Sequence, residues 1–431
     1  MGKISKPIRF FLTVVLITVI MSSLIHNVYI ANSERVILSN IPYYPMHHPT
    51  CAITALQMIF SYYGYNYSHT LLMVISGWGF GIYYSSKYRF GFGCSPYPVL
   101  AVIFTAKQLG FNATYRTFSD FNNALTWVKE NLRRGDPVFL EIKGHSVVAV
   151  GFDDGEGALY VHDPSGGMSS WGFLSEGRAL GLNVSWYVEE ITKREGFGAF
   201  VKVPYERMKE LWRWYRGYEA VLIKPVNPVT DLTKIKWVDI FDRVVTNTLY
   251  GLEYPEDEGI NAWLKLANDL RGNYSRDYLI IVKDYILGIA WRNRDDVASF
   301  FTGLSTVLNI SELRGVSWYF RMAASEYGLA YSLLGYAILH YNDTDVSNYV
   351  IRAAKYIEEG AQYEKKAAEL LSSKVSKSLR ARVSKVSTST TPTTQGITPL
   401  NAMYILAGFV LGLAIGAVVF KVKKRKSWSR H

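Results

Sequence analysis

Three residues of reactive type lie where the sequence predicts the ends of secondary-structure elements. Cys51 begins an apolar run, Cys51 to Tyr63, that has the pattern of a helix. His145 begins a strand-like run, and Asp163 ends another one just before Pro164. A thiol, an imidazole and a carboxylate are the parts of a cysteine-nucleophile triad. The unpaired N–H groups of a helix start and a neighbouring histidine both favour the reactive thiolate form.

The segments around His145 and Asp163 predict an antiparallel sheet. Three runs have strand character: Pro137 to Ile142, His145 to Phe152 and Ala158 to His162. The last two are joined at 153–157 by Asp-Asp-Gly-Glu-Gly, a composition typical of a hairpin turn. Such a hairpin places the strand ends that carry His145 and Asp163 side by side, and one packed helix brings Cys51 to them. Helical runs such as Asp120 to Arg134 precede these strands, which is the layout of an α+β domain.

The thiol also has two competing interpretations. Cys51 and Cys94 are the only cysteines, and two cysteines in an extracellular region ordinarily pair. A Cys51–Cys94 disulfide would make the chain a non-catalytic surface binding protein or receptor. A metal site from His47, His48, Cys51 and His145 is the less favoured alternative, because the spacing matches no strong zinc pattern. The sequence predicts neither a metal nor a cofactor.

Helices are predicted to dominate the chain after Asp231. From Asp231 to about Lys385 apolar residues recur every three or four positions, as in Trp318 to His340 and Asp345 to Leu371. The aromatic stripes of these runs are interpreted as the core of an all-α domain. Residues 386–399 are rich in serine, threonine and proline, which cannot build a core. They predict an extended stalk.

Both ends of the chain have the character of membrane segments. Residues 1–31 hold basic residues before an apolar stretch, which predicts a signal peptide or an N-terminal membrane anchor. Residues 402–420 are uncharged and precede the basic tail 421–431, which predicts a transmembrane helix with a cytoplasmic C-terminus. Membrane lipid is therefore an expected partner. Three glycines on one face of this helix would allow a homodimer through close helix packing: Gly408, Gly412 and Gly416.

The charge distribution predicts which part of the chain lies outside the cell. The net charge is +11, but residues 1–31, 373–398 and 421–431 carry three, five and six basic groups and no acidic ones. Residues 32–372 therefore carry a net charge of −3, which excludes a nucleic-acid-binding face. Because both membrane segments have positive outer flanks, the region between them is expected outside. Six candidate glycosylation sites fall in this region: Asn66, Asn112, Asn183, Asn273, Asn309 and Asn342.

The residues around the three reactive groups resemble a known enzyme family. His48-Pro-Thr-Cys51-Ala-Ile-Thr-Ala-Leu, together with Gly144-His-Ser-Val-Val and Tyr160-Val-His-Asp-Pro164, resembles papain-like cysteine peptidases of the bacteriocin-processing type. More closely, it looks like the N-terminal domain of butirosin-biosynthesis acyltransferases of the BtrH type. The glycine–aromatic stretch from Ser68 to Tyr84 is similar to theirs, and so is the helical region that follows. The resemblance covers roughly residues 36–372.

The resemblance implies a papain-like fold with Cys51 as nucleophile, His145 as general base and Asp163 as the residue that orients the imidazole. Bacteriocin-processing peptidases carry a glutamine shortly before the cysteine for the oxyanion hole, whereas residues 44–50 contain none. His47, His48 or backbone N–H groups are the alternatives for that role. The butirosin-type reaction takes its acyl group from a cytoplasmic carrier protein, so its substrate does not carry over to an exterior domain.

The predicted organisation has six parts: a signal peptide or membrane anchor (1–31), an α+β papain-like domain (36–228), an all-α helical domain (231–385), a stalk (386–399), a transmembrane helix (402–420) and a basic cytoplasmic tail (421–431). The favoured function is a membrane-anchored extracellular cysteine hydrolase or acyltransferase. Its expected substrate is a peptide or amide. The alternative is the binding protein whose Cys51 is tied to Cys94.

Overall fold

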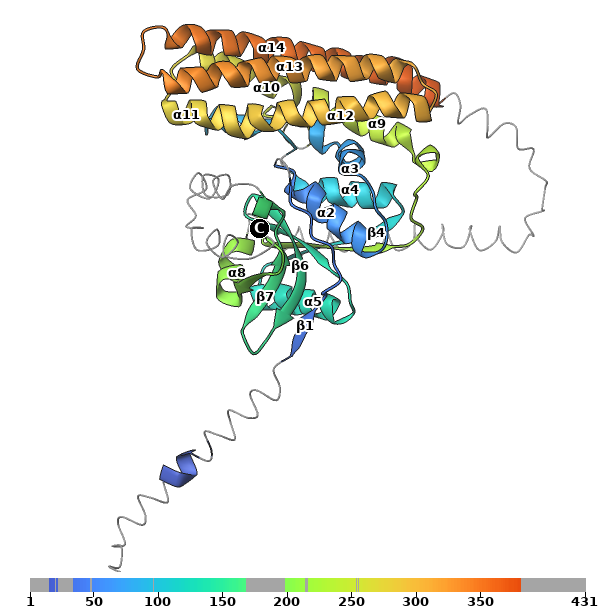
Figure 1. The fold of residues 1–431 in the computed structure, drawn as a ribbon, viewed down its shortest axis with the longest axis vertical. Coiled ribbons are helices and arrows are strands. Elements are labelled where there is room, and N and C mark those ends of the chain that lie inside the picture. Colours follow the sequence, from blue (N-terminus) through green and yellow to red (C-terminus); the bar gives the residue numbers. More distant parts are fainter. Residues whose placement is uncertain are drawn as a thin grey trace, which may run out of the picture. The chain divides into compact units, whose positions relative to one another are not determined.

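An antiparallel sheet runs through the first half of the chain (Figure 1). The computed structural model describes residues 15–19, 21, 34–46, 49–95, 97–167, 198–213, 216–252, 254 and 256–380. Among these residues the sheet has seven strands in the order β4-β9-β5-β6-β7-β8, and β1 also pairs with β6. The strands are β1 (Arg35–Ile37), β4 (Phe111–Phe118), β5 (Val138–Ile142), β6 (His145–Asp153), β7 (Ala158–His162), β8 (Val201–Pro204) and β9 (Tyr218–Pro225).

Strands β5, β6 and β7 form two successive hairpins. The two-residue turn between β5 and β6 ends at Gly144, whose φ of 67° is a left-handed conformation that glycine adopts without strain. Ile142 therefore pairs directly with His145. In the second hairpin Val148 pairs with His162, so the start of β6 and the end of β7 lie at the same end of the sheet.

Helices from the first half of the chain pack against this sheet (Figure 1). They are α2 (Cys51–Tyr62), α4 (Pro98–Gln108), α5 (Phe121–Arg133) and α8 (Tyr205–Trp212), whereas α3 (His69–Ser76) packs on α2 and α4. Helix α2 contacts both β5 and β6. Eight of its twelve residues are buried, and burial of this apolar helix holds its first residue, Cys51, against the sheet.

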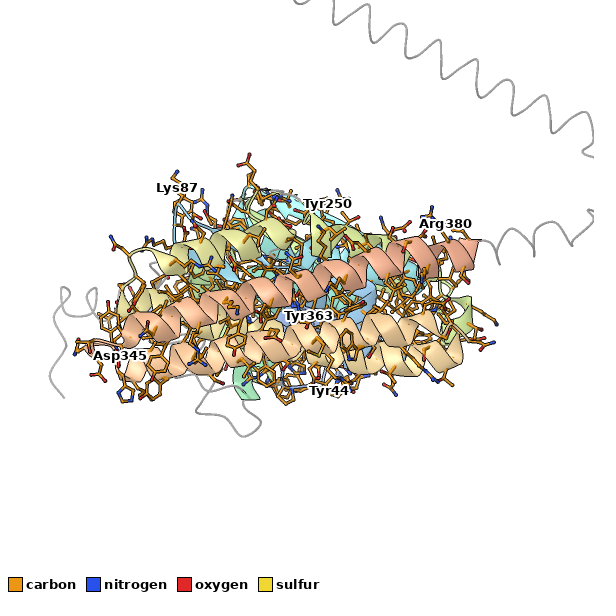
Figure 2. The ribbon with its side chains drawn as sticks, turned by 90° about the horizontal axis from the view of Figure 1, so that it is seen from above. Tyr44, Lys87, Tyr250, Asp345, Tyr363 and Arg380 are labelled. Carbon is orange, nitrogen blue, oxygen red and sulfur yellow. The ribbon has the colours of Figure 1, made fainter. Side chains whose placement is uncertain are left out.

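The second half of the chain is helical. Its elements are α9 (Trp237–Leu249), α10 (Gly259–Arg271), α11 (Arg276–Ile281), the π-helical turn η4 (Val282–Leu287), α12 (Gly288–Val307), α13 (Glu312–Leu339), α14 (Val346–Leu370) and the π-helical turn η5 (Leu371–Ser376). Helix α13 packs along both α12 and α14. Figure 2 shows the last helix from end to end, with Asp345 and Arg380 near its two ends and Tyr363 between them.

One hydrophobic core connects the sheet with the helical half. A continuous cluster of buried side chains extends from the strands and α2 to α9, α12 and α13. A second cluster fills the space between α10, α13 and α14, and it includes Tyr84 from the short strand β2 (Tyr83–Ser85), which pairs with β3 (Phe90–Phe92). The sheet and the helices therefore do not pack independently of each other.

A buried arginine joins the two halves. Arg294 of α12 is fully buried, and its Nε lies 2.5 Å from Oε1 of Glu364 on α14. Its Nη groups donate to the backbone carbonyl groups of Phe80, Gly81 and Gly93, each at 3.1 Å. The glycine–aromatic stretch of the first half is thus tied to the helices of the second half by charge-assisted hydrogen bonds.

The predicted membrane segments fall almost entirely beyond this part of the chain. The stalk, the transmembrane helix 402–420 with its three glycines, and the basic tail lie outside the described residues, as does most of 1–31. Within the ranges that the structure describes, no helix is both long and apolar enough to cross a bilayer.

Candidate active site

Cys51 occupies the first position of α2 and is half-buried. The first N–H groups of a helix have no partner within the helix, and no side chain caps the start of α2. The hydroxyl of Thr50, the natural candidate for a cap, lies instead 3.0 Å from Nε2 of His69 and 3.5 Å from Oγ1 of Thr54. The positive end of the helix dipole is therefore left facing the thiol.

His145 and Asp163 are in direct contact. Nε2 of His145 lies 2.7 Å from Oδ1 of Asp163, and both side chains are almost fully buried. His145 is the first residue of β6, and Asp163 directly follows β7. The two hairpins described above therefore place the imidazole and the carboxylate side by side.

The Asp163 carboxylate is held in place from several directions. The backbone N–H and the hydroxyl of Ser165 donate to Oδ1 of Asp163 at 2.7 and 2.6 Å. The hydroxyl of Tyr43 donates to the Asp163 backbone carbonyl at 3.1 Å. Burial alone would raise the pKa of Asp163, but the charge of His145 and the hydrogen bonds from His145 and Ser165 outweigh it and lower that pKa. Asp163 is thus an ionised, fixed acceptor for the imidazole.

His145 lies between Asp163 and Cys51. Burial alone would lower the pKa of His145, but the negative charges of Asp163 and Cys51 and hydrogen bonds to both raise it well above its ordinary value. Because Nε2 faces Asp163, Nδ1 is the ring nitrogen left for the thiol. The geometry suits proton transfer between the Cys51 thiol and the imidazole, with the tautomer fixed by Asp163.

The comparison with protein families points to the same part of the chain. Residues 38–174 match the Peptidase_C39 like family. The match supports a C39 peptidase-like domain of papain-like type, and this family suggests a cysteine hydrolase. All three reactive residues lie within the matched range. A search of curated proteins finds no match.

The sheet of the C39-like domain is completed by later residues. The match ends at residue 174, whereas β8 and β9 come after it and pair with β7 and with β4 and β5. Strand β9 contributes a buried glutamate, Glu219, directly opposite Glu141 of β5. Neither residue was predicted for the site. Glu141 had a visible signal, since it is an acidic residue inside the apolar run Val138 to Ile142.

The two alternatives to a nucleophilic Cys51 were a disulfide and a metal site. Cys51 and Cys94 are not joined by a disulfide, so the bond of the binding-protein interpretation is absent from this structure. No group of histidine, cysteine or acidic side chains in the described ranges could hold a metal ion, and His47 and His48 lie outside those ranges.

The predicted glycosylation sites stay predictions. Asn183 lies outside the described residues. The other five asparagines have exposed side chains: Asn66, Asn112, Asn273, Asn309 and Asn342. Exposure is what a sugar acceptor needs, and it is also the ordinary state of a surface asparagine.

Proposed function

We propose that the chain is a cysteine hydrolase that cleaves peptide or amide bonds through Cys51, His145 and Asp163. The observation that carries the proposal is the position of His145. One ring nitrogen is fixed by a buried, ionised Asp163, and the imidazole also hydrogen-bonds to Cys51 at the start of α2. This is the arrangement in which a thiol is activated by an adjacent base and the base is oriented by a third group.

The reaction follows from these contacts. His145 takes the thiol proton, and Sγ of Cys51 attacks the carbonyl carbon, so that the electron pair of the C=O bond moves to oxygen. When the tetrahedral intermediate collapses, the C–N bond breaks, His145 gives its proton to the leaving amine, and an acyl thioester remains. Water then gives a proton to His145 and attacks the thioester. The C–S bond breaks, His145 returns its proton to Sγ of Cys51, and the carboxylic acid is released.

Backbone N–H groups at the start of α2 are the proposed oxyanion donors. The domain lacks the upstream glutamine, but the first turn of α2 has no side-chain cap and its N–H groups point toward the thiol end of the helix. An oxyanion that forms on a carbonyl attacked by Cys51 lies next to these groups.

Transfer of the acyl group to an amine, as the BtrH-type resemblance implies, uses the same thioester. An amine in place of water at the second step turns the hydrolase into an acyltransferase without any change in Cys51, His145 or Asp163. Analysis of the products formed with and without an added amine distinguishes the two. Hydrolysis is favoured, because peptides are the acyl donors available outside a cell.

The proposed setting is the outer face of a membrane. It is supported by the uncharged stretch 402–420 with its basic flank. Protease treatment of intact cells should remove the domain and spare the C-terminal tail. A domain that survives this treatment and becomes sensitive only after lysis contradicts the proposed location.

Site-resolved alkylation tests the proposed function. Iodoacetamide should modify Cys51 of the full chain rapidly near neutral pH, and His145→Ala should slow this modification by about tenfold or more, since loss of the partner lowers the thiolate fraction. Cys94→Ala serves as the matched control and should leave the rate at Cys51 unchanged. A Cys51 rate that does not depend on His145, or a stoichiometric Cys51–Cys94 disulfide in the native protein, contradicts the proposal.

A further inference from the structure

An exposed arginine lies at the same end of the sheet as the proposed triad. Arg216 comes two residues before β9 begins. Strand β9 begins beside the end of β5, since Glu219 pairs with Glu141, and β5 ends where β6 begins at His145. Strands β9 and β6 flank β5, and neighbouring strands lie about 4.8 Å apart. Arg216 is therefore about two strand spacings from the start of β6.

Two helices begin side by side above this end of the sheet. Helix α2 begins at Cys51 and ends near the start of β5, because the hydroxyl of its last residue, Tyr62, donates to the Gly135 carbonyl at 2.7 Å. Helix α4 packs along β4 and ends just before that strand begins, so α4 itself begins beside the far end of β4, which pairs with the start of β9. Because α2 and α4 contact each other, and packed helices lie about 8–10 Å apart, their starts are roughly 10 Å apart.

The guanidinium of Arg216 is held at the start of α4. Its Cζ lies 5.9 Å from the ring centroid of Tyr97, the residue directly before α4. The side chain also hydrogen-bonds to Tyr115 of β4, whose own hydroxyl donates to Oε1 of Glu219 at 2.5 Å. A cation–π contact and a hydrogen bond thus fix a charge that solvent still reaches.

The helical half of the chain adds an aromatic ring to this place. Tyr254, between α9 and α10, has its ring centroid 5.6 Å from that of Tyr97, and 47% of the residue is exposed. Its backbone N–H donates to Oε1 of the buried Glu258 at 3.0 Å. Arg216, Tyr97 and Tyr254 are called the Arg216 cluster below. Of the three, only Tyr97 falls within the residues that match the C39-like family.

The turns at this end of the sheet are mainly positive. Half-buried Lys143 lies in the β5–β6 turn, where its N–H donates to the Leu211 carbonyl at 3.0 Å, and exposed Arg213 follows two residues after Leu211. The acidic residues of the strand ends are buried: Glu141, Asp163 and Glu219. Asp120 is exposed, but its carboxylate accepts from the N–H of Asn123 in α5. Such a charge distribution favours an anionic ligand.

We propose that the Arg216 cluster binds a carboxylate of the substrate. A guanidinium fixed against a tyrosine ring presents its outer N–H groups to a carboxylate, with which arginine forms bidentate hydrogen bonds. Tyr254 would cover the apolar part of the same substrate side chain. An extended peptide advances about 3.3–3.6 Å per residue, so the carboxylate would lie about three residues from the bond that Cys51 attacks. The role of Arg216 rests on the proposed function and narrows its substrates to acidic peptides or amides.

Matched pairs of alkylating probes test this role in the full chain. Each pair consists of an N-iodoacetyl amino acid and its carboxamide, and the series runs from glycine to longer ω-amino acids. The ratio of the two modification rates at Cys51, carboxylate over carboxamide, cancels the thiolate fraction because both probes meet the same thiol. In the wild type the ratio should be highest for linkers that span about 10 Å.

Arg216→Gln should remove this maximum. The ratio for the best linker should fall about fivefold, the size expected for an exposed ion pair, while the rate of the carboxamide probe stays unchanged. Arg216→Lys keeps the charge and should keep part of the preference. Arg116→Gln is the matched control, because Arg116 is exposed on β4 next to Tyr115 and therefore projects from the opposite face of the sheet. It removes the same charge and should leave the ratio unchanged.

Three results overturn the inference and leave the proposed function intact. The first is a ratio that is the same in R216Q and the wild type at every linker length. The second is an equal fall in R116Q, which would reflect net charge alone. The third is a loss in R216Q that affects both probes equally, since a purely structural residue gives that pattern. Failure of the proposed function has a different signature, namely a carboxamide rate at Cys51 that is insensitive to His145→Ala.

Discussion

The hydroxyl of Ser165 and the imidazole of His145 contact the same carboxylate oxygen, Oδ1 of Asp163, at 2.6 and 2.7 Å. The short turn after β7 therefore orients the carboxylate that orients the histidine. Ser165 itself is buried and has no direct role in the proposed chemistry. Its contribution is to keep Asp163 ionised and in one rotamer.

Removal of this hydroxyl is expected to weaken both activity and stability. Ser165→Ala leaves the backbone N–H donor in place and deletes one hydrogen bond to a charged group, which is worth about 1.5–3 kcal/mol. We expect a lower free energy of unfolding and a roughly tenfold lower kcat/KM, because the pKa of Asp163 rises when a donor to its charged form is lost. Urea unfolding and steady-state kinetics measure the two effects. Ser165→Thr should restore part of each, and equal losses in both variants argue against a hydroxyl-specific role.

Asp163→Asn should change the pH profile as well as the rate. The charge of Asp163 is the largest of the influences that raise the pKa of His145, so its removal lowers that pKa. The thiolate–imidazolium pair persists up to the pKa of His145, and the alkaline limit of the pair should therefore move to lower pH. We expect a loss of about 10⁴-fold in catalytic rate, as for the loss of an orienting carboxylate in a comparable triad. An unchanged alkaline limit in the pH profile of Cys51 alkylation contradicts the assignment of Asp163.

Glu141→Gln should stabilise the fold near neutral pH. The pKa of Glu141 is raised in the folded chain, so the folded state binds a proton that the unfolded state loses once the pH exceeds the ordinary glutamate range. Wild-type stability therefore falls as the pH rises through that window toward the folded pKa. E141Q has no such dependence and should be more stable than the wild type at neutral pH. The difference in unfolding free energy between E141Q and the wild type should vanish at acidic pH. Urea unfolding at several pH values measures it. A difference that does not depend on pH contradicts the prediction.

Two ion pairs of the helical half should differ strongly in their contribution to stability. Arg294→Met leaves Glu364 buried without its partner, and such a loss costs about 3–5 kcal/mol. The matched control is Arg271→Met, which breaks the partly exposed pair between Arg271 and Glu358 and should cost about 1 kcal/mol or less. Chemical denaturation of both variants gives the comparison. Similar losses of unfolding free energy in the two variants would mean that burial of Arg294 does not determine its contribution to stability.

The contact between His145 and Asp163 could be predicted because it depends on local structure. His145 and Asp163 lie at the ends of one hairpin, and the apolar run from Cys51 defines a helix start at the first residue. The observed bounds differ from the predicted ones by one residue or less: α2 ends at Tyr62 and β6 extends to Asp153. Short-range pattern was sufficient for these elements.

The acidic pair could not be predicted, because it depends on strands far apart in the chain. Strand β9 pairs with both β4 and β5, and only this pairing brings Glu219 beside Glu141. In β4 the polar residues Asn112, Thr114 and Arg116 alternate with less polar ones, which is a strand pattern, but this pattern does not tell which strand β4 pairs with. Tyr115, which donates a hydrogen bond to Glu219, depends on the same long-range pairing of β4 with β9.

The continuous core that joins the sheet to helices α9, α12 and α13 has a consequence for how the molecule comes apart. The buried side chains of each half pack against those of the other half. Neither half is therefore expected to stay folded when the other unfolds. The described region from residue 34 to 379 belongs to one compact unit. Heat or denaturant should therefore unfold this unit in a single cooperative transition. The structure around the proposed nucleophile Cys51 should then unfold at the same temperature as helices α12 and α13.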